Sequence, residues 1–339
     1  MLSAMHMRKK VIASFAIVYI VWGSTYVAIR FAAQLLQPAL LSGLRYSIAA
    51  ILLFTWLLVR GVPVRLPRHE LVQAGALGVL MFSLNTTLVN YGARRLSAGV
   101  VSLFLATIPL FIAILEAGLR AGSMSTAGWL GTCTGFAGLV LLTWYPLQGK
   151  QLTSGAGLAC LAVLFAAAVW AVGSVISKRL SRQASPLVLG AWQMMFAGVV
   201  NLAGGVFSGG VQASHWTASA WLATLYLATF GSVVCYTSYL FLLRTVNIST
   251  LATYAYINPV VAIIFGWLIL HERPHGLEWV GMAVVLTSVA IVIPSVTRNA
   301  KKPFTSLQAQ TPASVPGPIG EPELSLSISA RSQDQKELS

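Results

Sequence analysis

The sequence predicts an all-α integral membrane protein with ten transmembrane helices, arranged as two inverted five-helix repeats. Three observations predict this fold class: the composition, the number of membrane-length apolar segments, and an internal repeat. Hydrophobic residues make up 57% of the chain and charged residues only 9%, with a mean hydropathy of +0.78. A soluble domain carries roughly 25% charged residues, so this composition excludes a water-facing surface over most of the chain.

Ten apolar segments are long enough to cross about 30 Å of hydrocarbon, which takes roughly 20 helical residues. They span residues 11–29, 39–59, 71–91, 98–119, 127–145, 155–176, 186–207, 219–243, 248–270 and 277–296. The first five form a predicted repeat over 11–145, and the last five a second over 155–296. Residues 1–10 are a short N-terminus. Residues 301–339 are rich in Pro, Ser, Gln and Glu and cannot bury a core, which predicts a disordered tail.

The two halves of the chain repeat each other. Pro38 and Pro186 open the second and seventh segments, 148 residues apart. At an offset of 150, the matching pairs are Arg94 and Arg244, Pro109 and Pro259, Trp129 and Trp279, and Gly131 and Gly281. Because each half holds an odd number of spans, the second copy must enter the bilayer inverted. Inverted repeats that meet around a midplane cavity are typical of secondary transporters, so we expect a carrier.

The positive charges predict the orientation in the membrane. The chain carries a net charge of +14. With the N-terminus inside, the inner loops and ends hold 14 Lys or Arg residues and the outer loops hold 5. Cytoplasmic loops are enriched in Lys and Arg, so both termini are predicted in the cytoplasm. The basic balance therefore reports topology in a lipid bilayer, and no nucleic-acid partner is expected.

Several motifs resemble the EamA repeat of the drug/metabolite transporter superfamily. In the first copy they are Trp22-Gly-Ser-Thr-Tyr26, then Pro38, followed by Arg45-Tyr46. In the second copy they are Tyr254-Ala-Tyr-Ile-Asn-Pro-Val260, then His271-Glu272 and Trp279-Val-Gly281. The resemblance extends over roughly residues 10–297 and is to the bacterial inner-membrane branch of the superfamily.

The resemblance implies a ten-span, multi-pass carrier of the inner (plasma) membrane with both termini cytoplasmic. In the family, the spans that correspond to 1, 3, 4, 6, 8 and 9 line a central cavity, and many members export amino acids or related metabolites. The expected partner is therefore a small-molecule solute. One position departs from the pattern: the acidic residue after the fourth span of a repeat is Glu272 in the second copy but Gly122 in the first.

Polar and aromatic residues inside the apolar segments are the candidate solute-binding residues. Buried amides and phenols must be hydrogen-bonded, which suits a water-filled cavity or a bound polar solute. The candidates are Trp22, Asn85, Tyr91, Trp170, Tyr236, Tyr239, Tyr254 and Asn258. For the tyrosines the alternative is the aromatic belt at the membrane interface. For the two tryptophans, packing competes with a role as gates.

Two prolines and two charges complete the candidate site. Pro109 and Pro259 predict helix breaks in the fourth and ninth spans, and broken helices beside polar side chains favour solute binding. Arg45 lies within the second span, where Gln193 is its counterpart in the second repeat. A charge in the membrane is costly, which leaves solute binding, structural pairing and snorkelling as its possible roles. Glu116 precedes Arg120 by four residues, which favours a helix ion pair over proton coupling.

An intramembrane zinc hydrolase is the alternative function, because His271-Glu-Arg-Pro-His275 matches the HExxH pattern. That pattern needs a continuous helix, which Pro274 within the turn opposes. The three cysteines are scattered without ligand spacing, so no metal site is expected. No Gly-rich phosphate loop is present, so neither ATP nor another cofactor is expected, and proton or solute exchange remains for coupling.

Gly131 and Gly135 form a GxxxG pair on the fifth span. Such pairs suit close helix contact, either within one chain or across a dimer interface. The within-chain contact is favoured here, because random pairs are common in glycine-rich spans. A monomer and a homodimer therefore both stay open.

Overall fold

The computed structural model describes residues 2–119, 155–180, 185–245 and 254–272, and short helical pieces within 126–141 and 276–291. Every described element is a helix, which confirms the all-α fold for this part of the chain. Six helices within it are long and apolar enough to cross a membrane. The predicted fifth and tenth spans are described only in short helical pieces, and the predicted tail, 301–339, lies wholly outside the described residues.

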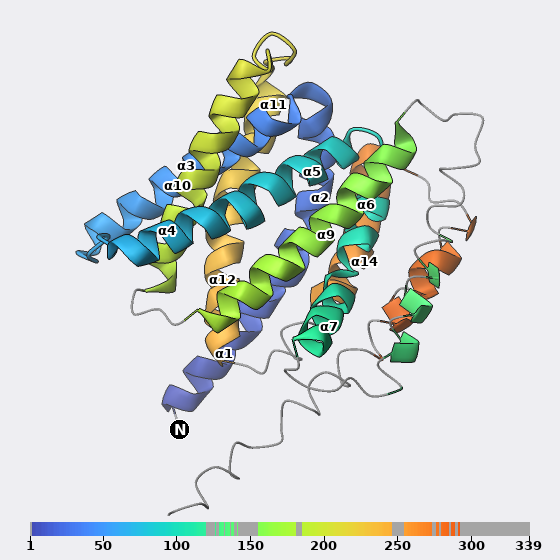
Figure 1. Ribbon diagram of the computed structural model, residues 1–339, viewed down its shortest axis with the longest axis horizontal. Coiled ribbons are helices and arrows are strands. Elements are labelled where there is room, and N and C mark those ends of the chain that lie inside the picture. The colour runs from blue at the N-terminus through green and yellow to red at the C-terminus, as the bar shows by residue number, and fades with distance from the viewer. Residues whose placement is uncertain are drawn as a thin grey trace, which may run out of the picture. The chain divides into compact units, whose positions relative to one another are not determined.

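The first repeat contains four described spans, and two of them include a π-helical stretch (Figure 1). The first span runs through α1 (Leu2–Ala16), η1 (Ile17–Val21) and α2 (Trp22–Leu35). The second is α3 (Pro38–Val59), and the third runs through α4 (Arg68–Leu77), η2 (Gly78–Leu84) and α5 (Asn85–Ala93). The fourth is divided into α6 (Ala98–Leu105) and α7 (Ile108–Gly118).

The second repeat follows the same order. Its spans are α9 (Ala156–Arg179), α10 (Pro186–Phe207), the run α11 (Ala218–Tyr226), η3 (Leu227–Val234) and α12 (Cys235–Thr245), and α14 (Tyr254–Leu270). Pro38 and Pro186 are each the first residue of their helix, where a missing backbone donor costs nothing. The observed bounds lie within a few residues of the predicted ones for most of these spans. The first helical run is longer than predicted at both ends, from Leu2 to Leu35, and the described part of the ninth span begins at Tyr254.

Pro109 and Pro259 are both predicted to break helices, but only the helix at Pro109 is interrupted. The chain leaves the helix at Ala106 and Thr107, immediately before α7, whose second residue is Pro109. The unwinding predicted at Pro259 is not seen, because α14 is continuous through it. Pro259 is the sixth residue of α14 and is buried, and the helix continues past the backbone hydrogen bond that the proline removes.

Loops predicted on the same side of the membrane meet in the structure. At the predicted outer side, His215 N donates to Leu35 O at 2.7 Å, and Gln37 N donates to Ser214 Oγ at 2.9 Å. At the predicted inner side, Trp192 Nε1 donates to Val64 O at 2.8 Å. These contacts join the two repeats at both ends of the bundle.

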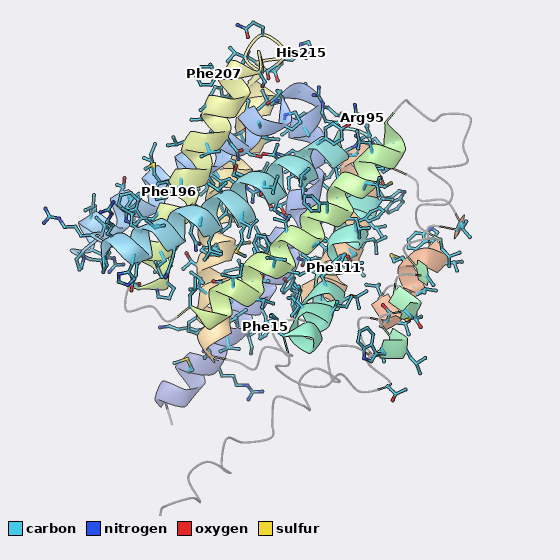
Figure 2. All side chains as sticks on the ribbon, in the orientation of Figure 1. Phe15, Arg95, Phe111, Phe196, Phe207 and His215 are labelled. Atoms are coloured by element: carbon cyan, nitrogen blue, oxygen red, sulfur yellow. The ribbon has the colours of Figure 1, made fainter. Side chains whose placement is uncertain are left out.

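The outward faces of the helices are apolar. Phe207 at the end of α10 is 90% exposed, and it projects from the molecule in Figure 2. Leu161 on α9 and Leu222 on α11 are also exposed. In water such surfaces would aggregate, but hydrocarbon solvates them, so these faces are suited to contact lipid.

The repeat-related helices α3 and α10 cross in direct backbone contact. A Cβ atom on Gly43 would lie 2.6 Å from the backbone nitrogen of Leu202. A Cβ on Gly198 would lie 2.7 Å from the backbone nitrogen of Ser47. Only glycine permits this approach, and small residues at helix interfaces play the same role in other membrane bundles.

This contact predicts the effect of alanine at two glycines of α10. Alanine improves helix propensity by roughly 1 kcal/mol at either position. At Gly204 a Cβ meets nothing within 4 Å, whereas at Gly198 it collides with the backbone of α3. We therefore expect Gly198→Ala to lower stability by about 1–3 kcal/mol and Gly204→Ala to leave it unchanged or raised. Thermal unfolding of the purified variants measures this, and equal melting temperatures would contradict the close contact.

Candidate functional site

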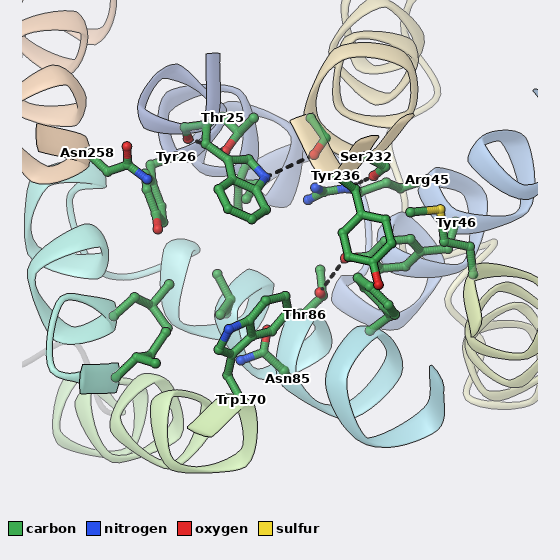
Figure 3. Close-up of a pocket in the computed structure, with 18 of the residues that line it drawn as sticks. Thr25, Tyr26, Arg45, Tyr46, Asn85, Thr86, Trp170, Ser232, Tyr236 and Asn258 are labelled. Carbon is green, nitrogen blue, oxygen red and sulfur yellow. Dashed lines mark hydrogen bonds between the residues drawn. The ribbon is translucent and has the colours of Figure 1, made fainter. Parts of the chain in front are cut away.

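A cavity of about 100 Å³ lies where the two repeats meet (Figure 3). The first repeat lines it with Trp22, Thr25, Tyr26, Ile29, Arg45, Tyr46, Phe82, Asn85, Thr86, Val89, Leu105 and Ile108. The second repeat adds Trp170, Met194, Gly231, Ser232, Tyr236, Tyr254 and Asn258. Spans 1, 3, 4, 6, 8 and 9 all contribute, and spans 2 and 7 contribute as well.

Most of the predicted site residues are brought together here. The lining includes Trp22, Asn85, Trp170, Tyr236, Tyr254, Asn258 and Arg45. Tyr91, Tyr239, Pro109 and Pro259 are not among the lining residues. The ring of Tyr91 lies 4.6 Å from the guanidinium of Arg95, which places it at the predicted outer end of the third span. Tyr239 packs behind the cavity, 5.5 Å from the ring of Trp22.

Aromatic rings form two clusters around the cavity. Phe82 packs edge-on against Trp170 at 5.9 Å and Tyr236 at 5.4 Å, so it joins spans 3, 6 and 8. Trp22 packs 5.5 Å from Tyr254 and donates from Nε1 to Gly231 O at 3.0 Å. Trp22 therefore links the first span of one repeat to the third and fourth spans of the other.

Both cavity asparagines are fixed by hydrogen bonds to backbone carbonyls. Asn85 Nδ2 donates to Ala166 O on α9 at 2.7 Å. Asn258 Nδ2 donates to Val18 O and Tyr19 O at 3.2 Å each, when its amide is oriented to face these acceptors. In both residues the amide nitrogen is thus occupied, and the oxygen Oδ1 is the polar atom that remains for a solute.

The carbonyls that Asn258 binds belong to the π-helical stretch η1. Cys235 Sγ also approaches a carbonyl of this stretch, Ile17 O, at 3.7 Å. A π-helical turn shifts backbone hydrogen bonds from i→i+4 to i→i+5 and often marks a functional region. Side chains of spans 8 and 9 here supply partners to the irregular part of span 1, which the membrane interior requires.

Two further π-helical stretches occupy matching places in the repeats. η2 ends immediately before Asn85, and η3 ends immediately before Cys235 and Tyr236. They could not be predicted from the sequence, because the glycine and hydrophobic residues in these stretches are equally compatible with a regular helix. Their place beside the cavity means that they set the direction in which Asn85 and Tyr236 point.

Arg45 is buried, with 6% of its surface exposed, and so it does not snorkel to the membrane surface. Its Nε donates to Ser232 Oγ at 2.9 Å, and its guanidinium lies 5.1 Å from the centre of the Tyr46 ring. The counterpart Gln193 is also buried, but its Oε1 accepts a hydrogen bond from Tyr236 OH at 3.1 Å. The first repeat thus presents a cation to the cavity, and the second repeat uses an amide to position a tyrosine.

Sequence reasoning missed several hydroxyl-bearing residues of the lining. Thr25, Thr86 and Ser232 line the cavity, and Thr86 Oγ1 lies 2.8 Å from Tyr46 OH. Serine and threonine are common in transmembrane helices, where they bond to their own backbone, so they give little signal alone. Tyr26 also lines the cavity and could have been predicted from the sequence, because it follows Trp22 by four residues and so lies on the same helix face.

Glu272 has a structural role in place of the metal chemistry that its motif suggests. Its Oε1 lies 3.3 Å from Arg30 Nε in an ion pair, and its Oε2 accepts from Ala98 N at 3.0 Å. It therefore caps the fourth span and ties the end of the ninth to the first. No cluster of three metal-ligand side chains occurs among the described residues, and His275 lies outside them.

Glu116 is on α7, but its side chain and Arg120 lie outside the part of the chain that the structure describes. On the fifth span, a Cβ at Gly135 would collide with Leu110 and approach Ser288 Oγ at 2.5 Å. Gly135 thus faces other helices of the same chain.

Comparison with known proteins gives a consistent assignment. The model of the EamA-like transporter family matches residues 9–144 and again 157–293. The uncharacterized inner membrane transporter YedA of Escherichia coli K12 is 31% identical over 277 residues, covering 81% of this chain and 87% of YedA.

More distant relatives point to the same kind of protein. An uncharacterized transporter of Synechocystis, sll0355, is 26% identical over 81% of this chain and 87% of its own. The S-adenosylmethionine/S-adenosylhomocysteine transporter of Chlamydia trachomatis is 26% identical over 76% of this chain and 81% of its own. A solved crystal structure with 20% identity superposes with a TM-score of 0.61 over 86% of this chain and 98% of its own, which supports the fold.

Proposed function

Because this chain belongs to the EamA-like transporter family, we propose that it is a secondary active transporter that moves a small amphipathic metabolite by alternating access. Membership of that family makes the chain a membrane transporter and not an enzyme. The observation that carries the proposal is the cavity, to which corresponding spans of both inverted repeats contribute. A site shared by two inverted repeats can open to either side when one repeat rocks against the other.

The size and lining of the cavity favour an amino acid or a related metabolite as solute. Its volume of about 100 Å³ is somewhat below the roughly 150 Å³ that holds a benzene molecule, so the solute is small. Aromatic rings and aliphatic side chains surround a few polar groups, which suits a solute with an apolar part. One relative is described as a transporter of S-adenosylmethionine and S-adenosylhomocysteine, which are amphipathic amino acid derivatives.

We propose export, driven by proton coupling or by solute exchange. No carboxylate lines the cavity among the described residues, which favours exchange over a proton relay within the site. A screen of radiolabelled amino acids in proteoliposomes, with and without an imposed pH gradient and with and without internal solute, tests both modes. Absence of uptake and counterflow for every solute would contradict the proposal.

Orientation in the membrane gives a direct prediction. The loop charges favour both termini in the cytoplasm, so a reporter fluorescent only in the cytoplasm should be active after Ser295. A reporter active only outside the cytoplasm should work after Lys150. Signals of the opposite kind at both positions would contradict the inverted orientation of the repeats.

The asparagines give a prediction with a matched control on one helix. Asn85 and Asn90 are both buried on α5 and both donate to backbone carbonyls, but only Asn85 lines the cavity. A solute group that loses its hydrogen bond to the asparagine oxygen would bind less favourably by roughly 1–3 kcal/mol. We therefore expect Asn85→Ala and Asn258→Ala to reduce uptake per folded molecule about 10-fold or more.

Asn90→Ala is expected to behave differently, because Asn90 joins the second and third spans through Pro38 O and Ser42 Oγ. It should lower the yield and melting temperature of the protein while leaving uptake per folded molecule close to that of the wild type. Uptake normalised to monodisperse protein measures this. Normal uptake in both Asn85→Ala and Asn258→Ala would remove the two residues from the site.

A further inference from the structure

Arg45 is a buried cation that faces the cavity, and no carboxylate among the described residues pairs with it. We propose that its guanidinium binds a carboxylate group of the transported solute, which defines the solute class as small carboxylates with an apolar remainder. This inference rests on the proposed transport function and names the chemistry of the same cavity. It selects solute binding from the three roles that the sequence left open for this residue.

The acidic side chains that the structure describes lie away from this cavity. The chain has eight acidic residues, and four precede residue 300: Glu70, Glu116, Glu272 and Glu278. Glu70 and Glu272 are the two of these four whose side chains the structure describes, and neither lines the cavity. Glu272 forms its ion pair with Arg30, at the predicted outer end of the bundle. Glu116 is eight residues beyond the last α7 residue of the lining, about 12 Å along the helix axis.

The guanidinium is held by one edge. Ser232 Oγ donates its own proton to Leu227 O at 3.1 Å, within the π-helical stretch η3, and so presents a lone pair to Arg45 Nε. This contact and the Tyr46 ring fix the group, and within the described part of the chain its terminal amino groups make no hydrogen bond to the protein. Figure 3 shows Arg45 reaching from its helix toward the interior of the pocket.

Space beside the guanidinium is kept open by a glycine. A Cβ on Gly231 would lie 3.3 Å from Arg45 Nη2, so any larger residue would crowd this edge of the group. Removing a cation from water without a counter-charge is unfavourable, and an anionic solute supplies that charge. The planar fork of a guanidinium also matches a carboxylate with two parallel hydrogen bonds.

The remaining lining fits the rest of such a solute. Ile29, Val89 and Leu105 give apolar surface. Asn258 lies across the pocket from Arg45 in Figure 3, and its Oδ1 can accept a hydrogen bond from a donor group of the solute. The second repeat has no equivalent cation, since Gln193 replaces the arginine and already accepts from Tyr236. The cavity therefore has one place for one carboxylate.

The test compares amino acids with their primary amides, which differ only at the carboxylate. Full-length protein in lipid nanodiscs is titrated with a panel of L-amino acids, each paired with its amide, and binding is followed by the fluorescence of tryptophan, since Trp22 and Trp170 line the cavity. The wild type should bind the acids that enter its cavity roughly 10- to 100-fold more tightly than their amides, as expected for a charge-assisted hydrogen-bonded pair.

Three variants separate charge from structure. Arg45→Gln, which copies the second repeat, should bring the ratio of acid to amide affinity close to one. Arg45→Lys keeps the charge and should retain part of the preference, although it loses the fork. Arg60→Gln removes a cation from the exposed end of the same span and should leave the ratio unchanged. If Arg45→Gln does not fold, the ratio of acid to amide affinity in the wild type and in Arg45→Lys tests the inference.

The inference is overturned if the wild type binds no acid of the panel, if it binds acids and amides equally, or if Arg45→Gln keeps the preference. Uptake into proteoliposomes distinguishes a failure of this inference from a failure of the proposed transport function. Equal uptake of acids and amides would support transport and contradict carboxylate binding by Arg45. Carboxylate-dependent binding without any uptake supports the role of Arg45 in the cavity and contradicts transport.

Discussion

The close contact between α3 and α10 is the constraint on which the rest of the structure depends. Gly43 and Gly198 let the two backbones touch, and hydrocarbon supplies no hydrophobic force that could replace this packing. Because the helices are repeat-related, their contact joins the halves where they cross, and spans of both repeats, these two included, surround the cavity. The same contact brings Arg45 and Gln193 into the interior from matching positions.

Hydrogen bonding in a medium without water explains why the cavity is built as it is. The π-helical stretches release backbone carbonyls from the regular pattern, and side chains of other spans bind them, as Asn258 does at Val18 and Tyr19. Each such bond orients a polar side chain and joins two spans. Trp22 and Gly231 form the same kind of link between the repeats. Polar groups that position the helices therefore also shape the solute site.

Much of the fold could be predicted from the sequence, because span length, loop charge and the repeat of Pro38 and Pro186 follow from the thickness and polarity of a membrane. Much of the lining of the candidate cavity could be predicted as well, since polar groups such as Asn85 and Asn258 are conspicuous in apolar segments. The features that could not be predicted depend on how the helices pack. Tyr239 has the same chemistry as Tyr236 but packs against Trp22 outside the cavity, and α14 continues through Pro259. The π-helical stretches have no distinctive amino-acid composition.

Alternating access requires the cavity to open to each side of the membrane in turn, and the accessibility of Val89, which lines it, tests this most directly. In a variant without Cys133, Cys160 and Cys235, Val89→Cys is treated with a membrane-impermeant maleimide from either side, in intact cells and in inverted vesicles. Val89→Cys should be labelled from both sides, while Val163→Cys, buried outside the cavity, should stay unlabelled. Labelling of Val89→Cys from one side only, or from neither, would contradict alternating access.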